Sequence, residues 1–198
     1  MEKKIGITGG SGSGKGFVCK ILSDMGYHCI DTDKVVHILY TENSECLEEL
    51  KNEFGDGIFE NGILVRRRLG DIVFSDSQKL ARLNEIVHKY VILQCDAICR
   101  ERFSMGETAV FIDAPQLFEA GMDKSVDAVV SVVADSDVRL ARIIERDKID
   151  RERALSRINN QHSNDFFVKN SDFVIQNTSE TVQSLTEQVK KMIEALKI

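Results

Sequence analysis

The sequence predicts an α/β fold in which a parallel β-sheet is flanked by helices, and three observations support this. Short apolar runs recur along the chain and suit parallel strands that are covered on both faces. Segments with apolar residues at helical spacing separate these runs. Polar residues gather where the predicted strands end, which is the edge at which α/β sheets bind ligands. With 198 residues, 42% of them hydrophobic, the chain can form one substantial core.

The first predicted strand, residues 4–7, leads into the glycine-rich stretch 8–16 and then into a helix. Between a strand and a helix, Gly-x-x-x-x-Gly-Lys is typical of a loop that binds a nucleoside triphosphate. Its glycines let backbone N–H groups turn toward the phosphates, and the helix N-terminus adds positive charge. Lys15 would reach the transferring end of the nucleotide. The sequence therefore predicts the P-loop nucleoside triphosphate hydrolase fold; the alternative is a glycine-rich turn that binds no ligand.

One position in this loop departs from the usual pattern. The motif normally closes with Ser or Thr, whose hydroxyl ligates Mg²⁺, and this chain has Gly16. Phosphate binding should survive the change, whereas the placement of Mg²⁺ must differ. The residues assigned to nucleotide binding are Gly10, Ser11, Gly12, Ser13, Gly14, Lys15, Gly16 and Phe17.

Residues 27–30 are predicted to form a second short strand, which ends at Asp31-Thr32-Asp33. A helix should follow, because Val35, Val36, Leu39 and Tyr40 lie at helical spacing. A strand that ends in two carboxylates places them at the mouth of the sheet. The alternative is that Asp31 or Asp33 only caps the helix.

Residues 44–103 are predicted to be mostly helical, with four apolar stripes and with turn signals at residues 55–57 and 61–62. A helical insertion of this length suggests a subdomain that covers the mouth of the sheet. The triplet 66–68, three consecutive arginines, could bind an anionic substrate or could form a solvated face. From the residues alone, His88 is a surface or core histidine.

The continuous apolar run 109–113 predicts a buried strand that ends in Asp113. In nucleoside triphosphate sites a carboxylate in this place helps to hold Mg²⁺, directly or through water. Residues 127–134 and 172–177 predict two further strands, and an apolar stripe from Val182 to Leu196 predicts a final packing helix.

Residues 136–161 form a region rich in arginine inside an acidic chain. A solvated helical hairpin is one interpretation. The other is a lid that closes over the triphosphate, since guanidinium groups bind phosphate bidentately and closure excludes water. The basic residues of this region are Arg139, Arg142, Arg146, Lys148, Arg151, Arg153 and Arg157.

Composition narrows the class of protein. The net charge of −6 argues against general nucleic-acid binding, and no apolar run approaches the length of a membrane span. Five cysteines without a zinc spacing indicate a reducing compartment. The first strand begins too early for a signal peptide, so we expect a cytoplasmic protein without membrane or nucleic-acid partners, a monomer or a weak homo-oligomer.

We expect a single domain over residues 1–198. Its core would comprise residues 1–40, 104–138 and 171–198, with a helical substrate-binding insertion at 41–103 and a lid at 139–170.

In this order, the motifs resemble those of the dephospho-CoA kinase family over nearly the whole chain. The opening Gly-Ile-Thr-Gly-Gly-Ser-Gly-Ser-Gly-Lys is similar to the family's phosphate loop, and Asp31-Thr32-Asp33 is similar to its Asp-x-Asp. The stretch 115–119, Pro-Gln-Leu-Phe-Glu, resembles the family's Pro-Leu-Leu-Phe-Glu. Further similarity lies in Arg142-x-x-x-Arg146-Asp147, in Gln161 and in Asp172-Phe-Val-Ile-x-Asn177.

The chain departs from the family at several of these positions. Gly16 replaces Ser or Thr, Gln116 replaces a leucine, and Lys89 follows His88 where the family usually has proline. His37 stands where the family often has arginine, and Ser171 replaces an alanine. Only Gly16 bears directly on the chemistry.

The resemblance implies an ATP-dependent kinase that phosphorylates the ribose 3′-hydroxyl of dephospho-CoA with Mg²⁺ as cofactor. It implies catalytic roles for Lys15, for Asp33 as the base and for Arg142, with Arg146 in support. Asn177 would lie near the adenine, and Asp113 would hold the metal. The implied substrate-binding residues are Asp33, His37, His88 and Phe118.

Two other functions remain open at this point. The first is another small-molecule kinase, for nucleosides or nucleoside monophosphates. The second is a nucleotide-binding protein whose transfer activity is impaired because of Gly16. A regulatory GTPase is disfavoured, since the sequence contains no Asn-Lys-x-Asp motif.

Overall fold

The structure is a computed structural model that describes residues 2–178 and 181–198. Its contacts divide the chain into two compact units. The first, here called the sheet unit, comprises residues 1–30 and 99–198, and the second, the helical unit, comprises residues 31–98. None of the described helices is long and apolar enough to cross a membrane.

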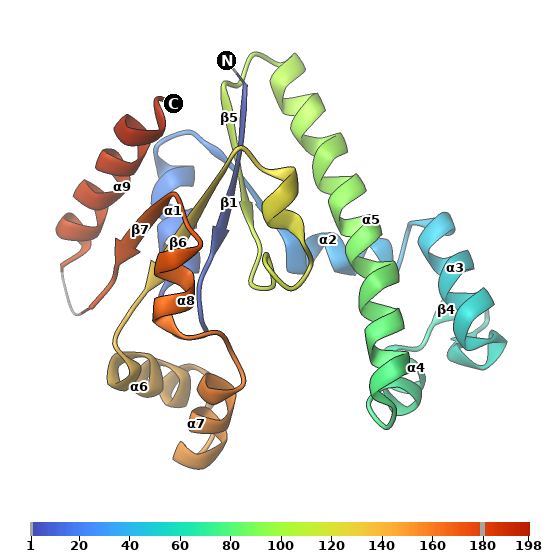
Figure 1. The fold of residues 1–198 in the computed structure, drawn as a ribbon. Coiled ribbons are helices and arrows are strands. Elements are labelled where there is room, and N and C mark those ends of the chain that lie inside the picture. The colour runs from blue at the N-terminus through green and yellow to red at the C-terminus, as the bar shows by residue number, and fades with distance from the viewer. Residues whose placement is uncertain (1, 179–180) are drawn as a thin grey trace. The chain divides into compact units, whose positions relative to one another are not determined.

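A five-stranded sheet organises the sheet unit, in the order β2-β5-β1-β6-β7 (Figure 1). The central strand β1 runs parallel to both β5 and β6, and β6 runs parallel to β7, so the predicted parallel sheet is confirmed. The phosphate loop therefore leaves the middle of the sheet, directly after β1. The strands are β1 Lys3–Thr8, β2 His28–Asp31, β5 Ala109–Asp113, β6 Ala128–Val133 and β7 Phe173–Gln176.

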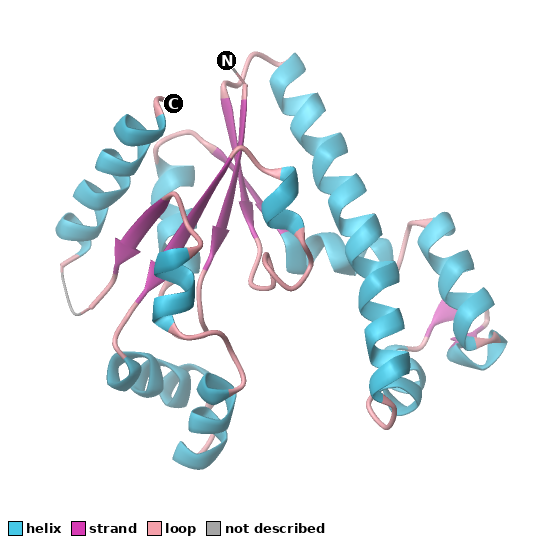
Figure 2. Ribbon diagram, viewed as in Figure 1, coloured by secondary structure: helices cyan, strands magenta, loops and turns pink. Residues whose placement is uncertain are grey.

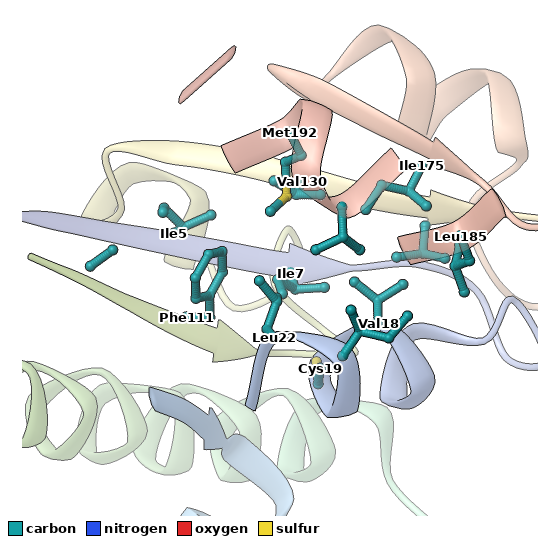
Figure 3. Close-up of a cluster of buried hydrophobic side chains, with 14 residues drawn as sticks. Ile5, Ile7, Val18, Cys19, Leu22, Phe111, Val130, Ile175, Leu185 and Met192 are labelled. Carbon is teal, nitrogen blue, oxygen red and sulfur yellow. The ribbon is translucent and has the colours of Figure 1, made fainter. Parts of the chain in front are cut away.

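One face of the sheet is covered by α1 (Lys15–Asp24) and by α9 (Val182–Leu196). Figure 3 shows the strand residues Ile5, Ile7 and Phe111 in the cluster that α1 and α9 complete. All three side chains are fully buried. Burial of such a side chain contributes about 1.5–3 kcal/mol, so this cluster anchors the helix that begins at the phosphate loop. The buried members from the helices are Val18, Cys19, Ile21, Leu22, Leu185, Val189 and Met192.

The other face of the sheet is also covered, which explains why all six residues of β6 are buried. Helix α8 (Asn164–Lys169) packs against β6, and the short helix η2 (Met122–Ser125) packs near β1. Leu117 approaches β1 so closely that a Cβ at Gly6 would lie 2.3 Å from its Cδ1. The chain between β5 and η2 therefore packs tightly on the strand that leads into the phosphate loop.

The arginine-rich region forms a helical hairpin of α6 (Ser136–Asp147) and α7 (Arg151–Asn159). Lys148 ends α6 in the left-handed conformation, and the Asp150 side chain caps α7 by accepting from the Arg153 N–H at 2.8 Å. The hairpin has a small core of its own, formed by Leu140, Ile143 and Ala154.

The helical unit is built almost entirely of helices (Figure 2). The sequence analysis missed one element, a two-stranded antiparallel hairpin. Its turn residues Asn61 and Gly62 both have positive φ, 50° and 80°, which is the geometry of a tight hairpin turn. The last two of the four predicted apolar stripes, within residues 80–87 and 91–99, belong to one continuous helix, α5. The elements are α2 Thr32–Leu39, α3 Ser44–Phe54, η1 Asp56–Ile58, β3 Phe59–Glu60, β4 Ile63–Leu64, α4 Arg66–Val73 and residues 77–98 of α5 (Ser77–Ser104).

Candidate active site

The glycine-rich stretch forms an open loop between β1 and α1. Gly12 and Gly14 have φ of 79° and 94°, which side-chain-bearing residues rarely adopt. Helix α1 begins after Gly14, with no side chain capping its N-terminus. The Phe17 N–H donates to the Gly14 carbonyl at 2.9 Å, and the uncapped helix start presents the positive end of the helix dipole, as at other helix ends that bind phosphate.

Glycine is also required in this loop because other segments press against it. A Cβ at Gly9 would lie 2.2 Å from the backbone oxygen of Val132, and one at Gly12 would lie 2.6 Å from the backbone oxygen of Arg139. Gly16 differs from both, since a Cβ there would meet no atom within 4 Å. No steric reason therefore requires glycine at Gly16.

Two hydroxyl groups of the loop region are buried without a hydrogen-bond partner among the residues that the structure describes. They are Thr8 Oγ1, at the end of β1, and Ser13 Oγ, within the loop. Buried polar groups in native proteins are almost always satisfied, so such atoms point to a ligand or water that completes them. Together with the uncapped helix, they fit a bound polyphosphate.

Lys15 forms an ion pair with Asp113, and both side chains are mostly buried, at 15% and 16% exposed. The pair follows from the topology, because β5 lies beside β1 and both strands end at the same edge of the sheet. The structure thus brings together the predicted phosphate-binding lysine and the predicted metal-binding carboxylate.

Arg139 is the most notable residue of the site that the sequence analysis did not single out. It is 3% exposed, and its Nε donates to the carbonyl of Ser11 at 2.9 Å. Its Nη2 donates to Oε1 of Gln161 at 3.0 Å, and the same oxygen accepts from the Ser11 N–H at 2.8 Å. Burial lowers the pKa of Arg139, but a guanidinium remains charged in proteins. A buried positive charge therefore lies against the phosphate loop.

Arg142, one turn further along α6, contacts the same loop. Its Nη1 donates to the carbonyls of Gly12 and Ser13 at 3.2 and 3.4 Å. Its Nη2 donates to Oδ1 of Asn177 at 3.3 Å, and Nδ2 of Asn177 donates to the Ser13 carbonyl at 2.8 Å. Arg142 and Asn177 thus hold the backbone of the loop from the side of β7.

Arg146 completes this row of arginines. Its Nη2 donates to Ser11 Oγ at 3.3 Å, and its guanidinium pairs with Asp147 at 2.7 Å. Asp147 also pairs with Arg157. The hydrogen bond from Arg146 lowers the pKa of Asp147, so this carboxylate stays ionised and orients both guanidinium groups.

The helical unit carries the predicted acidic pair, and its two members have different surroundings. Asp31 caps α2, because its side chain accepts from the N–H groups of Asp33 and Lys34 at 3.0 and 3.3 Å. Asp33 lies in the first turn of α2 with an exposed side chain. The alternative of a helix cap is therefore correct for Asp31 and leaves the Asp33 carboxylate available.

The remaining predicted substrate residues occupy separate places. His37 lies one turn after Asp33 and accepts at Nδ1 from Nη2 of Arg66, 2.8 Å away. His88 is half-buried on α5. Phe118, in the sheet unit, packs edge-on against Phe166 with ring centroids 5.1 Å apart.

Phe17, in the first turn of α1, is 40% exposed. It lines a cavity of about 550 Å³ together with residues of α1 and α9, including Met25 and Val182.

No group of three or more His, Cys, Asp or Glu side chains that could hold a metal occurs among the described residues. Asp113 is the carboxylate that the fold places beside the phosphate loop. Mg²⁺ usually takes one or two carboxylates, substrate phosphates and water, so this donor set fits Mg²⁺ bound together with a nucleotide.

Comparisons with known proteins agree with this geometry. The family model described as dephospho-CoA kinase matches residues 3–183. A dephospho-CoA kinase of Fusobacterium nucleatum is 39% identical over 166 residues, covering 83% of this chain and 84% of the relative. The crystal structure of TT1252 from Thermus thermophilus is 31% identical and superposes with a TM-score of 0.81, covering 100% of this chain and 98% of the other. The dephospho-CoA kinase from Campylobacter jejuni, 24% identical, has the same fold, with a TM-score of 0.72 and coverage of 99% and 98%.

Proposed function

The chain belongs to the dephospho-CoA kinase family, and from this premise we propose how its residues share the work of phosphoryl transfer. The protein is a kinase that uses ATP to phosphorylate dephospho-CoA at the ribose 3′-hydroxyl, the final step of coenzyme A biosynthesis. The observation that carries the assignment of roles is the phosphate loop, whose uncapped helix and orphaned hydroxyls fit a triphosphate.

The phosphates of ATP bind the loop from Gly10 to Gly16. The N–H groups at the start of α1 donate to phosphate oxygens, and Lys15 neutralises the β- and γ-phosphates. The ion pair with Asp113 supports this role, because it keeps the mostly buried ammonium group of Lys15 at the edge of the sheet where the loop begins. Asn177, whose Nδ2 donates to the Ser13 carbonyl, would lie near the adenine, and Phe17 at the start of α1 would contribute to nucleotide binding.

Asp33 is the proposed base. It orients the 3′-hydroxyl of the acceptor and accepts its proton as the new P–O bond forms. Its exposed carboxylate and the capping role of Asp31 support this assignment, since the cap holds the first turn of α2 in place. His37 and His88 of the helical unit, and Phe118 of the sheet unit, contribute to binding of dephospho-CoA.

Arg142 and Arg146 stabilise negative charge on the transferred phosphoryl group. Phosphoryl transfer proceeds through a loose transition state, so positioning and charge neutralisation contribute most of the catalysis. In the structure both arginines contact loop atoms, Arg142 through backbone carbonyls and Arg146 through Ser11 Oγ. Their side chains would exchange these contacts for phosphate oxygens when ATP binds.

Asp113 would hold Mg²⁺, directly or through water, in the presence of the nucleotide. The metal would supply charge neutralisation between the β- and γ-phosphates. Gly16 offers no hydroxyl, so Asp113 would be the protein group that holds the metal, together with water and the nucleotide. We further propose that the protein acts in the cytoplasm as a monomer or weak homo-oligomer, without nucleic-acid or membrane partners.

A coupled assay of ADP release tests the function. We expect turnover with dephospho-CoA and much slower turnover with adenosine or nucleoside monophosphates. Equal or faster turnover of a nucleoside monophosphate would assign the protein to another acceptor.

A further inference from the structure

We propose that Arg66, positioned by His37 and Tyr40, binds the diphosphate of the acceptor dephospho-CoA. This inference rests on the proposed function, because it concerns how the same acceptor is held. The site lies wholly within the helical unit.

The three consecutive arginines of α4 have different partners. Arg68 is tied to the β-hairpin, since its Nη1 donates to the Phe59 carbonyl at 3.0 Å and its Nη2 pairs with Glu60 at 3.3 Å. Arg66 forms no ion pair with any carboxylate in residues 2–178 and 181–198, and its hydrogen-bond partner is an imidazole. The positive charge of Arg66 is therefore not neutralised by the part of the chain that the structure describes.

The contact with His37 determines the chemistry of that ring. A guanidinium can only donate hydrogen bonds, so Nδ1 of His37 must accept at the observed 2.8 Å. In this arrangement the other ring nitrogen, Nε2, is the one that can donate to a ligand. Arg66 and the Nε2–H of His37 together present several donors and a positive charge, which is what a phosphate group requires.

Tyr40 holds the guanidinium from a second side. The Cζ atom of Arg66 lies 5.2 Å from the centre of the Tyr40 ring, within the range of a cation–π contact. Burial raises the pKa of Tyr40 to about 12, so its hydroxyl stays neutral and does not neutralise Arg66. Two uncharged partners thus orient the guanidinium and leave its charge for a ligand.

The position of the site matches the chemistry of the acceptor. His37 follows Asp33 by four residues on α2, so the two side chains lie on one face about 6 Å apart. In dephospho-CoA the diphosphate is attached to the 5′-carbon of the same ribose whose 3′-hydroxyl is phosphorylated. An acceptor whose 3′-hydroxyl contacts Asp33 would therefore place its diphosphate beside His37 and Arg66.

Other charges around the site do not cancel this preference for an anion. Lys34 forms an ion pair with Asp31 at 3.6 Å, and the Asp31 carboxylate also caps α2. Asp33 is the remaining carboxylate of α2, and its proposed partner is the acceptor hydroxyl.

The test compares Arg66→Gln with Arg68→Gln as a matched control from the same helix. Calorimetric titration with dephospho-CoA should show Kd raised about 10- to 100-fold by Arg66→Gln, the range for loss of a charge-assisted hydrogen bond. The Kd of ATP should stay unchanged. Arg68→Gln should change neither. Arg66→Lys, which keeps the charge but not the planar fork, should fall between wild type and Arg66→Gln.

Titration with adenosine adds a readout that a merely structural role would not move. Adenosine lacks the diphosphate, so wild type and Arg66→Gln should bind it equally. A dephospho-CoA affinity unchanged in Arg66→Gln, or an equal loss for adenosine and dephospho-CoA, would overturn the proposal. If wild type itself fails to phosphorylate dephospho-CoA, the proposed function fails instead, and the two failures are distinguishable. Should Arg66→Gln not fold, titrations of Arg66→Lys with dephospho-CoA and with adenosine decide the question, since only the affinity for dephospho-CoA should fall.

Discussion

The arginines of α6 and those of α4 are used in opposite ways. In the sheet unit, Arg139, Arg142 and Arg146 are spaced by three and four residues, so they share one face of α6. All three contact the phosphate loop. In the helical unit, the arginines of α4 are consecutive, so they point in different directions around the helix.

Burial follows from this difference in spacing. Along α6, Arg139 is buried, Arg142 is half-buried and Arg146 is exposed. The carbonyls of the loop satisfy the guanidinium groups that are removed from water. All arginines of α4 are exposed. The same residue type therefore supports a backbone in one unit and remains exposed to solvent in the other.

The largest effect should come from Lys15, which lies on the loop that the α6 arginines support. Lys15→Ala should lower kcat/KM about 10³-fold, because one preorganised charge on the transferred group is lost. Steady-state kinetics with ATP and dephospho-CoA measure this. Lys20→Ala is the matched control, since Lys20 is an exposed residue of the same helix and, within residues 2–178 and 181–198, its ion-pair partner is Asp24, one turn away. Unchanged rate and ATP affinity in Lys15→Ala would contradict the role of the loop.

The helical unit is tested next, through Asp33. Asp33→Asn should lower kcat roughly 10²-fold or more while KM for ATP stays the same, as expected for loss of a general base. Asp71→Asn, an exposed acid of α4, serves as the control. Near-normal turnover in Asp33→Asn would show that Asp33 is not the general base.

A substitution of Arg139 tests whether an arginine of α6 that contacts the phosphate loop contributes more to stability than an exposed arginine of α4. Arg139→Gln should destabilise the protein by about 2 kcal/mol, because hydrogen bonds from a buried charged group are lost. That corresponds to a Tm lower by roughly 4–8 °C for a chain of this size, and KM for ATP should rise as well. In contrast, Arg67→Gln on the exposed α4 should shift Tm by no more than about 2 °C. Equal shifts in the two variants would show that contact with the loop does not distinguish the two helices.

The smallest effect is expected at Gly16. Its open surroundings leave space for a hydroxyl, so Gly16→Ser should fold normally and retain or exceed wild-type activity. The added hydroxyl should also lower the Mg²⁺ concentration needed for half-maximal rate, which a magnesium titration of kcat measures. Loss of ATP binding in this variant would instead show that the backbone at position 16 requires glycine.

The sequence by itself determined the elements whose signals are local. The strand, glycine-rich loop and helix at residues 3–24 were predictable because the glycines and the apolar spacing act within a few residues. The parallel sheet was predictable from continuous apolar runs. The hairpin at residues 59–64 was missed because its strands are only two residues long, too short for any periodicity to register.

Only the tertiary structure decided which charged groups meet. Nothing local distinguishes Arg139 from the other arginines of its region, or shows that Asp31 caps a helix while Asp33 stays exposed. The contact of Lys15 with Asp113 joins residues far apart in the chain and depends on β5 lying beside β1. Such pairings depend on how the elements pack, because the burial and the partners of a side chain come from residues distant in sequence. Backbone conformation, in contrast, is determined mainly by residues close in sequence.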